Sequence, residues 1–252
     1  MANSTLDELI RQHAPDAVAA RLKHGRPRHN VSDAVLGGID GCITTFAIVT
    51  GAVGAGFPTH VSLILGIAKL FADGLSMAVS NYESIKAHND FINAVRREEE
   101  RHIDQVPEGE REEIRQIFAQ KGFADAALEH IVQTITADRR LWIETMLAEE
   151  HGLHGPHPNP LKSGAVTFAA FVLIGVIPLL PLSITTLSVP TQLYASLVLA
   201  GLVFFAIGSL KSLVFGQPAF KAGLATLLTG GAAAGIAYVV GYLLRSAFGI
   251  TG

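Results

Sequence analysis

The chain has 252 residues, of which 49% are apolar and only 16% are charged, and its formal net charge is −3. A soluble domain carries about 25% charged residues, so the composition argues against an ordinary soluble protein and points to a membrane protein. The small net charge gives no reason to expect a nucleic-acid partner. The single cysteine, Cys42, excludes an internal disulfide.

The first 30 residues are polar and contain no apolar core before a small-residue cleavage site. We therefore expect no signal peptide, and interpret residues 1–30 as a cytoplasmic N-terminal segment. The first membrane helix would then direct insertion itself.

Five apolar stretches follow, each long enough for the roughly 20 residues that a membrane helix needs. They cover residues 31–55, 61–84, 163–185, 191–214 and 219–244. Proline-containing segments separate neighbouring stretches at 56–60, 187–190 and 215–218, where a missing backbone donor suits a turn. The sequence thus predicts five transmembrane helices, the first two within 31–85 and the last three within 161–248.

A charged island at about residues 86–160 lies between the second and third stretches. Its first helix is expected to continue the second membrane helix as far as Asp104, and its second to run from Pro107 to Gly122. A third is expected over 125–150, with apolar residues at roughly helical spacing: Leu128, Ile131, Ile135, Trp142 and Met146. The predicted fold is all-α, a polytopic membrane protein with a three-helix cytoplasmic metal-binding domain inserted between transmembrane helices 2 and 3.

Basic residues near the helix ends predict the orientation, because Lys and Arg favour the cytoplasmic side. They precede the first and third helices and flank the turn before the fifth: Arg21, Lys23, Arg26, Arg28, Lys162, Lys211 and Lys221. The connections at 56–60 and 186–190 contain neither Lys nor Arg. We therefore expect a cytoplasmic N-terminus and island, and a C-terminus on the opposite side.

Acids in the island fall at spacings that place two ligands on one helical face. The pairs are Glu99 with His102, Glu110 with Glu113, and Met146 with Glu150. Oxygen-rich donors with one imidazole and one thioether suit Fe(II) or Mn(II). The alternative is that the charge runs at 96–101 and 111–113 are solvated faces.

Two further patterns in the island leave alternatives open. Glu99 and His102 form one Glu-x-x-His, which di-iron carboxylate bundles use twice, but no second copy occurs. A membrane-anchored ferroxidase or iron-storage protein is therefore an alternative, and a metal sensor is another. The loop histidines either hold a metal at the mouth of a pathway or belong to a polar linker: His151, His154 and His157.

Carboxylates also occur inside the predicted membrane helices, where a charge costs at least ~2.5–3.5 kcal/mol. Asp33 and Asp40 share one face of the first helix, and Thr44 adds an oxygen to it. Such groups usually line a cation or proton route.

The second membrane helix offers three polar or sulfur-containing residues at intervals of four: Lys69, Asp73 and Met77. Lys69 and Asp73 either take part in the route or simply neutralise each other. Met77 is either core or lipid-facing, or forms a mixed hard and soft cation site with Asp40.

Small residues at a spacing of four allow membrane helices to approach closely. Such pairs are Gly37 with Gly41 in the first helix and Gly231 with Gly235 in the fifth. A homodimer sharing the first helix would double the ligands around Asp40 and Met77.

The chain resembles the vacuolar iron transporter family over about residues 28–248. The run 32–47, with Gly37-Gly38-Ile39-Asp40-Gly41, is similar to that family's first-helix signature, and 72–78 to its second. The segments 107–114 and 146–153 resemble its cytoplasmic domain, and 175–181 its third helix.

This resemblance implies a homodimer of five-helix subunits that exports Fe(II), often also Mn(II), from the cytoplasm in exchange for protons. Asp40 and Met77 would be ligands in the path between the two first helices, with Asp33 nearer its cytoplasmic mouth. Ligands of the cytoplasmic domain would be Glu99, Glu110, Glu113, Met146 and Glu150.

The chain departs from the family pattern in the island, where His102 stands in place of a glutamate and Leu147 in place of a second methionine, and these changes bear on metal preference. Lys69 replaces a membrane glutamate, and its combination with Asp73 resembles a bacterial variant of the family. We therefore expect a proton-coupled exporter in a bacterial inner membrane, not an enzyme and without a prosthetic group. Its ions would be Fe(II) or Mn(II), with Zn(II) and Co(II) as further candidates. Its partners would be protons, lipid and a second copy of the chain.

Overall fold

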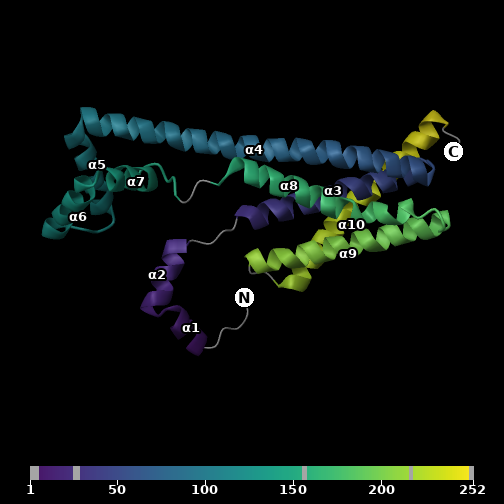
Figure 1. Cartoon of the computed structure of the whole chain (residues 1–252), viewed down its shortest axis with the longest axis horizontal. Helices are drawn as coiled ribbons and strands as arrows, with labels where there is room; N and C mark the ends of the chain where they lie inside the picture. Colours follow the sequence, from purple (N-terminus) through teal and green to yellow (C-terminus); the bar gives the residue numbers. More distant parts are fainter. Residues whose placement is uncertain (1–5, 25–28, 155–157, 216–217, 250–252) are drawn as a thin grey trace. The chain divides into compact units, whose positions relative to one another are not determined.

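The computed structural model describes residues 6–24, 29–154, 158–215 and 218–249, and all regular structure within these ranges is helical. In chain order (Figure 1) the elements are α1 (Leu6–Gln12), α2 (Pro15–His24), α3 (His29–Gly54), α4 (Thr59–Gln105), α5 (Pro107–Gln120), α6 (Asp125–Ala137), α7 (Arg139–Glu149), α8 (Pro160–Gly175), the 3-10 helix η1 (Ile177–Ser183), α9 (Val189–Phe215) and α10 (Ala219–Phe248). Arg26, Arg28 and His157, named above, lie outside the described residues.

The chain divides into two compact units. One, which we call the membrane unit, comprises Met1–Tyr82 and Pro160–Gly252, and the other, the acidic unit, comprises Glu83–Asn159. Helix α4 is one uninterrupted helix of 47 residues that contributes to both. The expectation that the second membrane helix continues into the charged island is therefore confirmed.

Within the described residues, four helices are long and apolar enough to cross a membrane, namely α3, α4, α9 and α10. The predicted third span, 163–185, is not one straight helix. It consists of α8 and η1, which meet at a bend of 40°. Pro178 and Pro181 lack the amide hydrogen that an α-helix needs, so the chain continues beyond Gly175 as a 3-10 helix.

Helix α3 packs against α8, α9 and α10 in the membrane unit. A Cβ atom on Gly41 would lie 2.3 Å from the carbonyl oxygen of Phe171, and one on Gly37 equally close to that of Thr167. The close packing expected of this glycine pair is thus made with α8 of the same chain. At Gly231 and Gly235 a Cβ atom would meet nothing within 4 Å, so the second pair makes no such contact within the described chain.

In the acidic unit, Pro107 occupies the first turn of α5 and Gly122 follows its end with φ +93°, as predicted. The expected third helix is instead two helices, which makes four helical segments with the end of α4. Asp138 has an extended backbone between them, and its carboxylate accepts hydrogen bonds from the N–H groups of Arg140 and Leu141. This N-cap marks the start of α7 as a separate helix.

The predicted apolar face is confirmed in the core of the acidic unit. Buried side chains from all four segments form this core: Val95, Ile103, Ile114, Val132, Ile135, Trp142, Ile143, Met146 and Leu147. Leu128 and Ile131 pack against it. The core brings the end of α4, the start of α5 and the end of α7 together, which positions the acids described next.

Candidate metal-binding sites

Two glutamates are buried in the acidic unit. Glu99 on α4 is 2% exposed and Glu110 on α5 is 3% exposed. In each, the Oε2 atom is buried and has no hydrogen-bond partner within the described chain. A buried carboxylate oxygen without a donor is costly, so both positions suit a bound cation.

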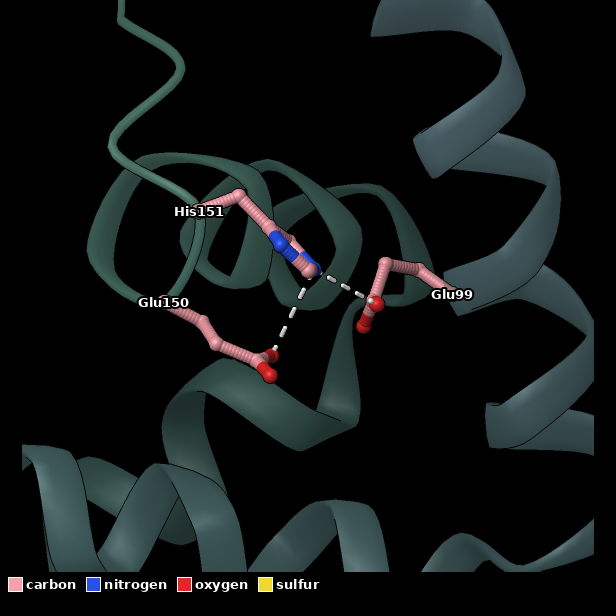
Figure 2. A group of neighbouring side chains, drawn as sticks. All are labelled: Glu99, Glu150 and His151. Atoms are coloured by element: carbon pink, nitrogen blue, oxygen red, sulfur yellow. Dashed lines mark hydrogen bonds and ion pairs between the residues drawn. The ribbon is translucent and has the colours of Figure 1, made fainter.

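Two histidines lie beside these carboxylates. His102 Nδ1 is 3.4 Å from Glu110 Oε1. His151 Nε2 is 3.0 Å from Glu99 Oε1 and 3.6 Å from Glu150 Oε2 (Figure 2). One ligand atom from each of Glu99, Glu150 and His151 lies within 4.8 Å of the others, which is a separation that one ion can span.

The acids of this unit influence one another through their charges. Burial, followed by the charges of Glu113, Glu99 and Glu150, raises the pKa of Glu110 to about 7. Burial is also the main reason that the pKa of Glu150 is raised. The pKa of His151 is raised chiefly by its hydrogen bond to Glu99. A raised carboxyl pKa means that the group tends to hold a proton. A bound cation would take the place of such protons and reduce the repulsion between the carboxylates.

Of the six predicted island residues, Glu99 and Glu150 lie in one group with His151, and His102 lies beside Glu110. The charges of Glu99, Glu113 and Glu150 act on Glu110. That these residues form one metal site stays a prediction. Met146 is fully buried in the apolar core, one turn before Glu150. Its role as a thioether ligand stays a prediction.

Sequence reasoning did not place His151 in this group. The residue lies beyond the end of α7 at Glu149, so helical spacing cannot assign it to a face. The sequence had offered His151 only as a loop histidine, either holding a metal at the mouth of a pathway or belonging to a polar linker. His154, from the same loop, is exposed.

In the membrane unit, Asp33 is buried and its Oδ1 accepts a hydrogen bond from Asn81 Nδ2 at 3.0 Å. The same amide nitrogen donates to Thr167 Oγ1 at 2.8 Å. Asp33 Oδ2 is buried without a partner among the described residues. Asn81 and Thr167 were not predicted as site residues, because nothing in their spacing relates them to Asp33.

Asp40 is partly buried on α3, and the charges of Asp73 and Lys69 both act on it. Lys69 Nζ lies 2.8 Å and 2.6 Å from the two carboxylate oxygens of Asp73, so the predicted pairing is confirmed. Met77 packs partly buried against the apolar cluster around Phe171, and Thr44 is also partly buried. That these side chains form one transport path stays a prediction.

This fold and these sites define a polytopic helical membrane protein with a carboxylate-rich unit inserted between its second and third apolar segments. Residues 31–242 match the model of the VIT family, and the chain belongs to this family. The resemblance found in the sequence is thereby confirmed.

The chain aligns with named relatives over most of both sequences. The chain is 33% identical over 228 residues to a vacuolar iron transporter of Toxoplasma gondii, covering 87% of this chain and 76% of that protein. It is 30% identical over 254 residues to the vacuolar iron transporter of Plasmodium falciparum, covering 95% and 93%. It is 29% identical over 224 residues to vacuolar iron transporter 1 of Arabidopsis thaliana, covering 88% and 89%.

Proposed function

We propose that the protein is a transporter that moves Fe(II), and also Mn(II), out of the cytoplasm in exchange for protons. The observation that carries this proposal is the cluster around Glu99 and Glu110, whose buried oxygens lack donors, in a chain whose relatives are named iron transporters. Carboxylate and imidazole donors together suit first-row divalent ions.

In this proposal the acidic unit faces the cytoplasm and collects the metal from it. The ion then passes to Asp40 and Met77, with Asp33 nearer the entrance. Protonation of Asp40 would weaken its hold on the ion and reset the carrier, because a carboxylate must be deprotonated to bind a metal. The predicted cytoplasmic N-terminus and bacterial inner membrane belong to the same proposal. The named relatives are vacuolar proteins of eukaryotes.

An exposed ion pair supports a homodimer. The side chains of Lys69 and Asp73 are 53% and 32% exposed, although they lie in the apolar part of α4. Charges are expensive in contact with lipid hydrocarbon, so this face requires a cover. A second copy would cover it and place a second Asp40 and Met77 beside the same path.

The test is metal flux into proteoliposomes with an imposed pH gradient, for wild type and Asp40→Ala. Asp16→Ala, an exposed carboxylate on α2, is the matched control. We expect Fe(II) and Mn(II) flux that requires both the gradient and Asp40. Normal flux in Asp40→Ala would exclude the proposed path, and flux without gradient dependence would exclude proton coupling.

One observation favours a second candidate function, a ferroxidase. The cluster contains four carboxylates and two imidazoles, namely Glu99, Glu110, Glu113, Glu150, His102 and His151. Di-iron carboxylate bundles use the same composition. Oxygen consumption by the full-length protein with Fe(II) in air, lost in Glu99→Gln, would establish this activity. If a protein that still transports metal consumed no oxygen, the ferroxidase function would be excluded and only the transport function would remain.

A further inference from the structure

His151 does not belong to the set of ligands that helical spacing predicts for the island. Its imidazole reaches the space between Glu99, at the end of α4, and Glu150, at the end of α7 (Figure 2). Glu99 is 52 residues away along the chain. The folded acidic unit therefore adds a nitrogen atom to two carboxylates from different helices.

The turn after α7 is built to hold this imidazole. The N–H of His151 donates to the carbonyl oxygen of Met146 at 3.4 Å, and the N–H of Leu153 to that of Leu147 at 2.8 Å. Gly152 between them has φ +66°, which a glycine adopts readily. Leu153 packs against the apolar core, so the loop is anchored on both sides of His151.

Glu99 supplies the second, independent indication of a ligand. Its Oε1 pairs with His151, whereas its Oε2 is buried and lacks a donor. The carboxyl of Glu110, whose own Oε2 also lacks a donor, lies within hydrogen-bonding reach of Glu99, so Glu99 faces a second acid as well as His151. A cation bound at Glu99, Glu150 and His151 would offset the negative charge gathered there.

We propose that His151 is a nitrogen ligand which, with Glu99 and Glu150, forms a subsite that selects Fe(II), Co(II) and Zn(II) over Mn(II). The inference rests on the proposed function, because it assigns the metal preference of the loading site. Imidazole suits Fe and Zn, whereas all-carboxylate sites suit Mn(II), Mg(II) and Ca(II). Removal of the imidazole should therefore weaken the first group of ions more than Mn(II).

The first test is calorimetric titration of the full-length protein in detergent with Co(II) and with Mn(II). His151→Gln retains an amide that can hydrogen-bond to Glu99 but removes the imidazole. His130→Gln, at an exposed position on α6, is the control. We expect His151→Gln to weaken Co(II) binding by about tenfold or more, an effect seen even for supporting groups of metal sites, and Mn(II) binding by less.

Equal weakening of both ions would overturn the proposal, because His151 would then only order Glu99. Unchanged affinities would overturn it as well. A second variant, His151→Cys, places a thiolate at the same position. We expect Co(II) to produce a sulfur-to-cobalt charge-transfer band that is absent from wild type and from His130→Cys. Its absence would show that the side chain at 151 does not contact the metal.

These outcomes are distinct from failure of the proposed function. If the protein binds Co(II) through residue 151 but gives no flux in proteoliposomes, the proposed subsite stands and the proposed transport function fails. If it transports normally but binds the ions without preference, the transport function stands and the subsite fails.

Discussion

Asn81 on α4 donates a hydrogen bond to the buried carboxylate of Asp33 on α3 at 3.0 Å. The second hydrogen of the same amide is directed to Thr167 on α8 at 2.8 Å. One side chain therefore joins three helices of the membrane unit. The membrane unit also contains the chain's only cysteine, Cys42, which is fully buried, so the reaction of its thiol with a fluorescent reagent reports opening of this unit.

Replacement of Asn81 should destabilise the membrane unit. Asn81→Ala leaves Asp33 without its donor, and a lost hydrogen bond to a charged group costs about 1.5–3 kcal/mol. We expect Cys42 to react at a lower temperature than in wild type. Asn93→Ala, an exposed asparagine on the same helix, should leave the transition unchanged. Equal transitions for all three proteins would show that the Asn81 hydrogen bonds do not stabilise the unit.

Replacement by alanine should destabilise the membrane unit at Gly41 and stabilise it at Gly235. Gly41→Ala places a methyl group 2.3 Å from a backbone oxygen of α8, and such overpacking costs about 1–3 kcal/mol. Gly235→Ala meets open space within the chain, and alanine favours a helix over glycine by about 1 kcal/mol. Thermal labelling of Cys42 measures both. A stable Gly41→Ala protein would contradict the close approach of α3 and α8.

The bridge between Arg115 and Glu129 should make stability of the acidic unit depend on pH. Arg115 Nε donates to Glu129 Oε1 at 2.8 Å and joins α5 to α6. This hydrogen bond holds the pKa of Glu129 below its ordinary value. Such a carboxyl stabilises the folded state above its unfolded pKa, and that contribution is lost as the pH falls through its folded pKa.

Trp142 is the only tryptophan and is buried in the acidic unit, so its fluorescence measures this effect. Glu129→Gln should lower the thermal transition at about pH 7, and the difference from wild type should shrink as the pH falls through the lowered pKa of Glu129 and the carboxyl is protonated. Glu144→Gln is the control, because Glu144 pairs with Arg140 within α7 alone. A difference that persists unchanged at low pH would contradict the ion pair as its cause.

Metal binding should stabilise the folded acidic unit, and this effect should depend on Glu99. Binding to the folded state alone adds about 2.7 kcal/mol at 100 times the Kd. Co(II) should therefore raise the Trp142 transition, and a chelator should reverse the change. Glu99→Gln should remove most of this shift, because Glu99 is the buried carboxylate shared by the cluster. The same shift in Glu99→Gln would place the ion elsewhere.

Much of the fold could be read from local patterns. Apolar length located the membrane helices, and Pro107 and Gly122 marked the limits of α5 because each imposes a local backbone preference. Two features escaped this reasoning. The break at Asp138 depends on a cap between two helical sequences. The bend after Gly175 follows from Pro178 and Pro181, whose effect inside an apolar stretch long enough for one span was not recognised.

The candidate metal site could likewise be predicted only in part from the sequence. Spacing alone selected Glu99, Glu110 and Glu150 as ligand candidates, because residues on one helical face recur every three or four positions. Only the tertiary structure buried Glu99 and Glu110, paired Asp33 with Asn81, and carried His151 to a carboxylate 52 residues away. These are contacts between segments distant in the chain, and they depend on packing of the core rather than on any local preference of the residues involved.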